Sequence, residues 1–396
     1  MTARWDPIGE LQSAYPQMVE WRRYLHRYPE LSFQEKRTSA WIAGKLRSFG
    51  CKVTEGIGGY GVIADIEGEG EGPCIALRAD IDALPIQDAK QCEYSSTVPG
   101  VMHACGHDGH TATLLAIAKT YSDNRDGWNG SRRFIFQPAE ELCPGGANAM
   151  IRDGVLEGVD AIYGVHLWTP FPYGIVATRG GAFMAAPDEF KIEIVGQGGH
   201  GGLPHQTIDA VIAGASLVQS LQTIVSRNVD PLEPTVVTVG SFQAGSTGNV
   251  IAEKAVLLGT VRTFTSEARA RIRDRMESII AHTAAMFNAS ITFDYREGYP
   301  AVINDEAEAA RFDAVAAELF GRQAVQQSTL IMAGEDFSYY LQKVKGCFLF
   351  VGAGGEACGA VHPHHHPKFD IDERAMLMSA RLLIGMAEHR AAEKRG

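Results

Sequence analysis

The 396-residue sequence lacks an excess of positive charge, and it lacks long apolar runs. Its 36 Lys and Arg residues are outnumbered by 47 Asp and Glu residues, which gives a formal net charge of -11. This argues against a nucleic-acid-binding protein, which needs a basic face. No apolar stretch reaches the ~18–20 residues that a membrane-spanning helix requires, and the N-terminal residues lack the basic-then-apolar pattern of a secretory signal. We therefore expect a cytoplasmic protein that binds neither nucleic acid nor a membrane.

Cysteines are few and widely spaced. The chain has seven of them, an odd number, and no CxxC pair. A disulfide scaffold is not expected in a chain of this size, and the cysteine usage favours a reducing compartment.

The length predicts more than one domain, because single cores rarely grow beyond ~250–300 residues. In the first 185 residues, short apolar strands alternate with helical segments, which predicts an α/β sheet covered on both faces. Ligands bind beyond the carboxyl ends of the strands in such sheets. Three of the predicted strands run directly into polar residues: 74–77 into Asp80 and Asp82, 133–137 into Glu140 and Glu141, and 161–165 into His166.

The middle of the chain has a different pattern. Residues 186–298 read as strand, helix, strand, strand, helix, strand, which is the ferredoxin-like order. We expect this segment to be inserted into the larger domain. The predicted domains are therefore 1–185 together with 299–396, and 186–298 between them.

Metal-binding residue types are densest between residues 102 and 110, where His103, Cys105, His107 and His110 occur together. Thiolate and imidazole ligands suit Zn, Co, Ni or Mn, and the Cys-x-His spacing lets both side chains face one ion. Asp108 is placed to orient an imidazole, or to cap a helix predicted over 108–121. The alternative is a helix start whose histidines bind nothing.

Three further features carry metal-binding or acid–base residues. Glu140 and Glu141 follow a strand, His166 ends a strand, and four histidines lie within residues 362–366. Alone, each has an ordinary explanation: a solvated acidic turn, a structural histidine, and a surface tract that binds metal opportunistically. The three features indicate a metal site only when they are considered together.

Together these features supply a thiolate, a carboxylate and three imidazoles, from Cys105, His107, Glu141, His166 and one histidine of the C-terminal tract. That set is enough for two metal ions. Two ions ~3.5–4 Å apart polarise a carbonyl and lower the pKa of a water between them. Glu140, which is not needed as a ligand, could accept the proton of that water and pass it to a leaving nitrogen.

At this point the chain resembles the aminoacylase/carboxypeptidase family of co-catalytic metallohydrolases. It is most similar to the branch of hippurate hydrolase, bacterial N-acyl-amino-acid amidohydrolases and plant auxin-conjugate hydrolases. The resemblance covers nearly the whole chain. It rests on motifs in this order: HRYPELS at 26–32, RADIDALP at 78–85, MHACGHD at 102–108, QPAEE at 137–141, GVH at 164–166, GGHGGLPH at 198–205, GEDF at 334–337 and HHPKFD at 365–370.

The resemblance implies a mixed-sheet, metallopeptidase-like catalytic domain with an inserted lid or dimerisation domain. It implies metal ligands at Cys105, His107, Glu141 and His166, and a general base at Glu140. The family pattern His-x-Pro-x-aromatic-Asp places the fifth ligand at His365, although His362, His364 and His366 crowd that assignment. Asp80 stands where related branches have a ligand histidine, which puts a ligand role there in doubt. Asp82 is then expected to orient a ligand.

In the inserted segment, the resemblance implies that His200 stabilises the tetrahedral oxyanion, often across a dimer. Asn249 and Arg262 resemble the contacts to the substrate carboxylate. Arg262 lies on a predicted strand and could pair with a carboxylate, although a surface salt bridge is the alternative.

We therefore predict a hydrolase with two divalent ions per subunit (Zn, Mn, Co or Ni), which cleaves N-acyl amino acids into a carboxylic acid and an amino acid. The chain is expected to form a homodimer or homotetramer through the inserted domain. A metallo-carboxypeptidase or dipeptidase acting on a short peptide is the nearest alternative. A non-catalytic metal-binding protein is the alternative from another class, but it leaves the upstream motifs unexplained.

Overall fold

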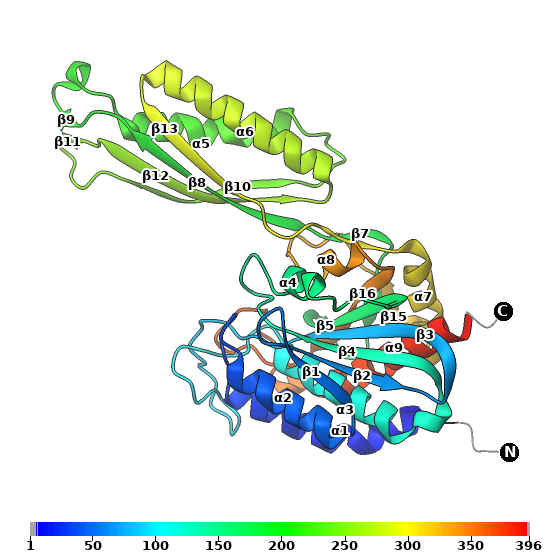
Figure 1. Ribbon diagram of the computed structural model, residues 1–396. Coiled ribbons are helices and arrows are strands. Elements are labelled where there is room, and N and C mark those ends of the chain that lie inside the picture. Colours follow the sequence, from blue (N-terminus) through cyan, green and yellow to red (C-terminus); the bar gives the residue numbers. More distant parts are fainter. Residues whose placement is uncertain (1–4, 6, 394–396) are drawn as a thin grey trace. The chain divides into compact units, whose positions relative to one another are not determined.

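The computed structural model describes residue 5 and residues 7–393 (Figure 1). The chain folds into two compact units. The first comprises Met1–Phe183, Ile303–Thr329 and Asp336–Gly396, and the second comprises Met184–Val302 and Leu330–Glu335. In sequence, the second unit thus consists of one long insertion into the first and one short segment of six residues.

The first unit is built on an eight-stranded sheet. Its strands, in spatial order, are β1 (Lys52–Ile57), β2 (Gly61–Glu67), β4 (Asn129–Gln137), β3 (Gly70–Asp80), β5 (Ala161–Pro172), β16 (Gly346–Gly354), β6 (Val176–Thr178) and β15 (Val325–Gln327). The central strands β4, β3, β5 and β16 are parallel. Antiparallel pairs join β1 to β2, β2 to β4 and β6 to β16, and β15 runs parallel to β6. The predicted mixed α/β fold is confirmed.

Helices cover both faces of this sheet (Figure 1). One face carries α1 (Pro7–Arg27), α2 (Lys36–Ser48), α3 (His107–Asp123) and α9 (Arg374–Glu393), and the other carries the short helices α4 (Ala147–Arg152) and α8 (Ser338–Leu341). Helix α7 (Glu306–Phe320) packs beside α9. Helix α3 packs between α1, α9 and the sheet, and its residues 112–118 are all buried. This explains its apolar sequence on every side.

The start of α3 differs from the prediction. Gly106, with φ of 96°, occupies the N-cap position, and the helix begins at His107. The expectation that Asp108 caps this helix is wrong, because Asp108 is already helical and its carboxylate accepts a hydrogen bond from Arg22 Nε at 2.8 Å. A glycine at position 106 adopts the left-handed backbone without the steric cost of a side chain.

The second unit has a four-stranded antiparallel sheet in the order β10–β12–β8–β13. Its main elements are β8 (Ala186–Val195), α5 (Ala210–Arg227), β10 (Val236–Ala244), β12 (Lys254–Thr263), α6 (Ser266–Phe287) and β13 (Ser290–Arg296). The strand and helix order is the predicted one. Alternate residues of β8 (Phe190, Ile192 and Ile194) are buried, as the two-residue period of a strand with one buried face requires. The roles of this unit as lid and dimerisation surface stay predictions.

Shorter elements complete the chain. In the second unit, β9 (Gly199–His200) pairs with β11 (Val250–Ile251). Strands β7 (Gly181–Met184) and β14 (Val302–Asn304) cover two of the four points where the chain passes between units. Short 3₁₀ turns occupy Arg125–Gly127, Pro204–Gln206, Arg322–Ala324 and Glu356–Cys358.

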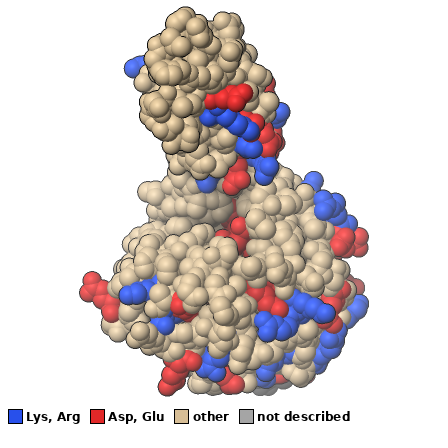
Figure 2. Space-filling view, turned by 90° about the vertical axis from the view of Figure 1, so that its left-hand side faces the viewer, with Lys and Arg blue, Asp and Glu red and all other residues tan. Residues whose placement is uncertain are grey.

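Surface charges of both signs are interspersed on the face of the larger unit seen in Figure 2. Within residues 5 and 7–393, no helix combines the length and apolar character needed to cross a bilayer. All seven cysteines lie in the described part of the chain, and no disulfide joins any two of them.

Asp188 of β8 connects several segments of the second unit through hydrogen bonds. Its fully buried carboxylate accepts hydrogen bonds from Arg269 Nε at 2.7 Å, Tyr295 OH at 2.6 Å and the backbone N–H of Gly298 at 2.9 Å. Removal of one member of a buried ion pair leaves the other uncompensated.

We expect Asp188→Asn to lower the free energy of unfolding by about 2–4 kcal/mol. The matched control is Asp294→Asn, which removes an exposed ion pair with Arg296 and should change stability by no more than about 0.5 kcal/mol. Chemical denaturation monitored by circular dichroism measures both. Equal effects of the two substitutions would contradict the assignment of Asp188 as the polar anchor.

Candidate metal centre

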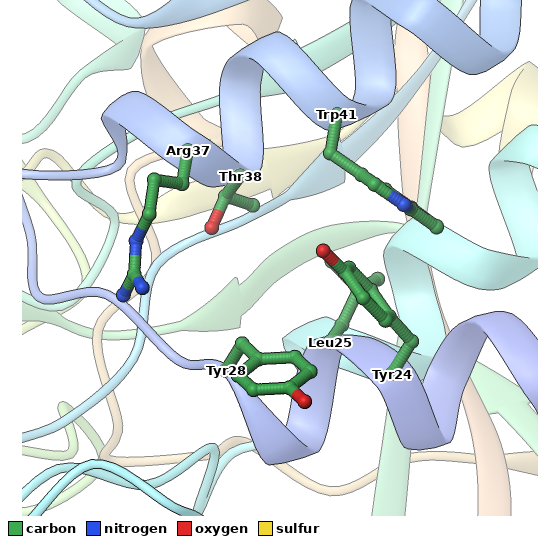
Figure 3. Close-up of a pocket in the computed structure, with 6 residues that line it drawn as sticks. All are labelled: Tyr24, Leu25, Tyr28, Arg37, Thr38 and Trp41. Atoms are coloured by element: carbon green, nitrogen blue, oxygen red, sulfur yellow. The ribbon is translucent and has the colours of Figure 1, made fainter.

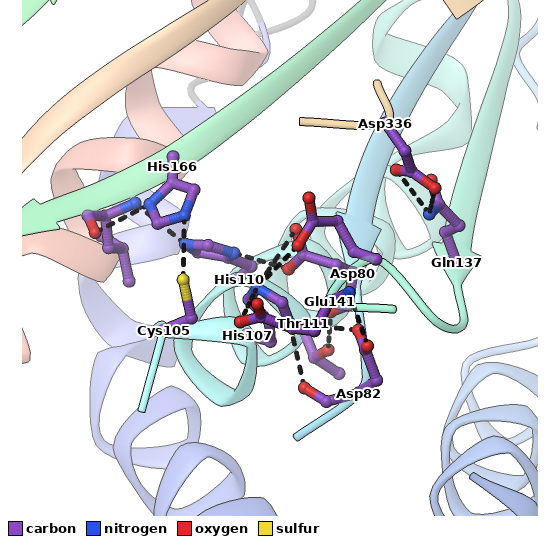
Figure 4. Close-up of polar contacts among 12 residues, drawn as sticks. Asp80, Asp82, Cys105, His107, His110, Thr111, Gln137, Glu141, His166 and Asp336 are labelled. Atoms are coloured by element: carbon purple, nitrogen blue, oxygen red, sulfur yellow. Dashed lines mark hydrogen bonds and ion pairs between the residues drawn. The ribbon is translucent and has the colours of Figure 1, made fainter. Parts of the chain in front are cut away.

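The candidate site lies at one edge of the large sheet, where the parallel strands β3 and β4 end (Figure 4). Strand β3 ends on Asp80, which pairs in register with Gln137 at the end of β4. The neighbouring strand β5 carries His166 within its length and continues to Pro172, so the predicted strand end before His166 is wrong. Parallel strands bring their carboxyl ends to the same edge. This explains why residues from four sequence segments, including the start of α3, meet here.

His107 is held by Asp82. Its Nδ1 lies 2.9 Å from the carbonyl oxygen and 3.2 Å from the carboxylate of Asp82, so it donates to these oxygens. Asp82 also accepts the hydroxyl of Ser32 at 2.7 Å and the backbone N–H of Glu141 at 3.0 Å. Carboxylates orient metal-binding imidazoles in this way.

Two buried polar atoms of the site have no hydrogen-bond partner among the described residues: His107 Nε2 and Glu141 Oε1. Leaving buried polar atoms unpaired costs about 1–3 kcal/mol each. Both atoms are good ligands for a divalent metal, and a cation between them would satisfy both at once. The residues therefore fit a metal ion.

Two groups of potential ligands share one thiol. Cys105, His107 and Glu141 form the first, and Cys105, His166 and His364 form the second; within each group the ligand atoms lie within 4.8 Å of one another. His166 donates from Nδ1 to the carbonyl of Leu167 at 3.0 Å, which leaves the lone pair of Nε2 directed to Cys105 Sγ at 3.5 Å. A shared thiolate between two adjacent groups suits a pair of ions.

The electrostatics of the site favour bound positive charge. Burial opposes protonation of His107, but Asp80 and Asp82 outweigh it and raise the pKa of His107 to about 10. Burial, followed by the carboxylates of Glu141 and Glu140, raises the pKa of Cys105 well above its ordinary value. Without a cation, the imidazole holds a proton and the sulfur stays a thiol; a divalent ion would replace both protons.

Asp80, His107 and His110 form a third group with ligand spacing, and in it Asp80 and His110 are already engaged in hydrogen bonds. His110 Nδ1 lies 2.6 Å from Asp80 Oδ1, and its Nε2 accepts the N–H of Leu167 at 2.9 Å. Asp80 in turn accepts from Arg78 Nη1 at 2.6 Å. We interpret this series of hydrogen bonds as a structural support for the metal ligands. His110 itself is not a proposed ligand, because metal binding would break one of the two hydrogen bonds that its ring nitrogens make.

The C-terminal tract brings two histidines to the site. His364 Nδ1 lies 3.8 Å from Cys105 Sγ, and its Nε2 accepts the N–H of Thr169 at 3.3 Å. His365 Nε2 lies 3.4 Å from Glu141 Oε2. Proximity to Cys105 favours His364 as the fifth ligand, whereas the family pattern predicts His365. Hydrogen bonding favours His365, because a neutral His364 that accepts at Nε2 carries its proton on Nδ1.

Glu140 is buried, and its Oε2 lies 4.0 Å from His107 Nε2. The residue before it, Ala139, has a left-handed backbone with φ of 55°. Glu140 is thus placed beside the ligand cluster by an unusual turn.

Asp108 has other partners than those expected. Its carboxylate accepts from Arg22 Nε at 2.8 Å and lies 2.7 Å from His26 Nδ1. The imidazole that it orients is therefore His26, which is not among the predicted ligands. The spacing of the motifs did not predict the contacts of Asp108 with Arg22 and His26, because these two residues belong to α1, which is distant in sequence.

The three predicted substrate contacts lie in the second unit. His200 is exposed on β9, where its Nδ1 accepts the N–H of Gly202 at 2.9 Å, and it stands opposite Val250, next to Asn249. Arg262 of β12 is half-buried and donates from Nε to the carbonyl of Met332 at 3.1 Å. His200 and Asn249 therefore form one local group, and Arg262 belongs to the sheet.

A pocket of about 270 Å³ lies elsewhere in the first unit (Figure 3). Residues of α1 and α2 line it: Tyr24, Leu25, Tyr28, Arg37, Thr38 and Trp41. None of these is a candidate ligand, so this pocket does not belong to the metal centre.

Comparison with known proteins identifies the family. Residues 76–389 match the model of peptidase family M20/M25/M40. The chain belongs to this family. It is accordingly a metal-dependent hydrolase of amide bonds, and the predicted family resemblance and two-metal cofactor are confirmed.

Relatives in the family agree in length and fold. An N-acyl-L-amino acid amidohydrolase of Geobacillus stearothermophilus is 49% identical over 74% of this chain and 79% of its own length. An N-acetyl-L-cysteine deacetylase of Bacillus subtilis is 43% identical over 97% and 90%. A crystal structure of a Bacillus subtilis dinuclear metal-binding peptidase of the M20 family matches with a TM-score of 0.82 and 35% identity, over 96% of this chain and 99% of that one.

Proposed function

We propose that this M20 enzyme hydrolyses the amide bond of N-acyl amino acids, and releases a carboxylic acid and a free amino acid. The observation that carries the proposal is the convergence of Cys105, His107, Glu141 and His166 in one cluster, with Glu140 buried beside it. Relatives with this chemistry support it, since one acts on N-acyl-L-amino acids and another on N-acetyl-L-cysteine.

In this proposal, Cys105, His107, Glu141, His166 and His365 hold two divalent ions, of zinc, manganese, cobalt or nickel. When bound, such ions polarise the acyl carbonyl and lower the pKa of a water between them. Asp82 keeps the lone pair of His107 Nε2 turned into the site through its hydrogen bonds to Nδ1.

Glu140 is the proposed general base. It takes a proton from the attacking water and delivers it to the leaving nitrogen, so that the amino acid departs as a neutral amine. His200 is proposed to donate a hydrogen bond to the oxyanion of the tetrahedral intermediate. Asn249 and Arg262 are proposed to bind the α-carboxylate, which requires Arg262 to exchange one of its present carbonyl contacts for the substrate.

Two further proposals concern the setting of the enzyme. The absence of disulfides among the seven described cysteines supports a reducing, cytoplasmic location. The exposed apolar residues Val195 and Leu258, which share one face of the sheet of the second unit, support assembly into a homodimer or homotetramer through this unit.

Substrate preference tests the proposed function. We expect kcat/KM for N-acetyl and N-benzoyl amino acids to exceed that for matched dipeptides by at least about tenfold. The physical reason is that the free ammonium group of a dipeptide would bring a positive charge next to two cations. A preference for dipeptides would contradict the proposal and indicate a peptidase.

The role of Glu140 is tested by a pair of neighbouring substitutions. Glu140→Gln should lower kcat by about 10²–10⁴-fold, the usual contribution of a general base, with two metal ions still bound. Glu141→Gln is the control, and it should lower metal content as well as activity. A loss of less than tenfold in Glu140→Gln would rule out the base role.

The fifth ligand is tested by substitution of each of the two neighbouring histidines. We expect His365→Ala to reduce bound metal from about two ions per chain to about one. His364→Ala should retain both ions, because its ring nitrogens are engaged with Thr169 and Cys105. Elemental analysis of the purified proteins measures the content. The opposite pattern would assign the ligand to His364.

A further inference from the structure

One buried carboxylate close to the site has no role in the mechanism above. Glu35 precedes α2 and has no exposed surface. Its Oε1 accepts two backbone hydrogen bonds, from Phe33 N–H at 3.0 Å and from Ala139 N–H at 2.8 Å. Although Glu35 stands at the N-cap position of α2, its side chain makes no capping bond to that helix. Its partners lie elsewhere, in particular at Ala139.

Both donors to Glu35 have an unusual backbone. Among the described residues, only Phe33, Ala139, Asn288 and His365 combine a side chain with positive φ. Two of these four, at 63° and 55°, donate to the same oxygen of Glu35. A left-handed conformation costs a residue with a side chain about 1–2 kcal/mol. Such a conformation persists only where the surroundings hold it in place.

Ala139 is held from both sides of its Cα atom. Its N–H donates to Glu35, and its carbonyl accepts the N–H of Gly146 at 3.1 Å. The next residue along the chain is Glu140, and the one after it is Glu141, whose N–H is fixed by Asp82. The carboxylates of both glutamates lie within 4.0 Å of His107 Nε2. The left-handed turn at Ala139 is thus the point from which both side chains enter the metal centre.

We propose that Glu35 is a positioning residue that holds Ala139 in its left-handed conformation and thereby aims Glu140 and Glu141 at the metal centre. The role assigned to Glu140 rests on the proposed function, whereas the role assigned to Glu141 rests on metal binding. Glu35 contacts neither substrate nor metal in this proposal. It acts through one backbone N–H.

Two substitutions at position 35 separate hydrogen bonding from volume. Glu35→Gln keeps an oxygen acceptor for Ala139 N–H and should leave kcat and metal affinity within about threefold of the unmodified enzyme. Glu35→Ala removes the acceptor. It should weaken metal affinity and lower kcat by about 10–100-fold each, the range typical of residues that support metal ligands, with less than about threefold change in KM.

The most decisive experiment asks whether a second substitution, at position 139, restores the metal affinity and kcat that Glu35→Ala loses. A glycine adopts positive φ without strain, so Ala139→Gly should restore about tenfold of the lost metal affinity and kcat when combined with Glu35→Ala. A purely structural role of Glu35 predicts no rescue. Glu308→Ala is the matched control, because it removes another buried carboxylate, bound to Tyr163 and Arg311, in the same unit. It should lower stability and leave metal affinity and kcat unchanged.

Metal affinity is measured by titration of zinc or manganese into the metal-free full chain. The turnover number kcat is measured with N-acetyl amino acids as substrates. The titration needs no substrate, so it tests Glu35 even if the enzyme prefers another amide. The proposal is overturned if Glu35→Ala binds metal as tightly as the unmodified chain. It is equally overturned if the folded double variant shows no recovery, or if Glu308→Ala weakens metal binding as much as Glu35→Ala.

Discussion

The metal centre depends on the hydrogen bonds between Asp82 and His107 Nδ1. They fix which nitrogen of the imidazole faces the site, and the same carboxylate takes the backbone N–H of Glu141. One acidic side chain therefore places two of the proposed ligands, one from the start of a helix and one from the turn after a strand. His166 is fixed in a similar way by the carbonyl of Leu167. In each case hydrogen bonding leaves a buried nitrogen lone pair for a cation.

A second layer of buried charges keeps these residues in place. Arg78 bridges Asp80 and Asp336, at 2.6 and 2.9 Å, and Asp80 in turn binds His110. On the far side of the helix start, Arg22 joins Asp108 and Asp370, at 2.8 and 2.6 Å. Asp370 lies just after the histidine tract, so Arg22 links this tract to α1 and α3. Buried charges are costly unless paired. Apart from Arg78 and Asp80, which lie on one strand, each pair here joins segments that are distant in sequence.

Much of this could be predicted from the sequence, because it depends on local pattern. Strand ends that run into Asp80, Glu140 and His166 predicted a shared edge, and two-residue and 3.6-residue periods predicted the order of elements in the second unit. What could not be predicted depends on hydrogen-bond direction and on long-range contacts. Spacing alone did not reveal that Asp108 contacts His26, that His364 of the C-terminal tract lies beside Cys105, or that Glu35 accepts a hydrogen bond from Ala139.

The central claim is that catalysis requires two divalent ions at a centre built around Cys105. The most direct measurement follows metal content and N-acetyl amino acid hydrolysis on one sample, through chelation and stepwise addition of metal. Activity should vanish with the metal and return in proportion as about two ions per chain are restored. In Cys105→Ala, the same additions should not restore it. Full activity in the metal-free chain, or in Cys105→Ala, would contradict the claim.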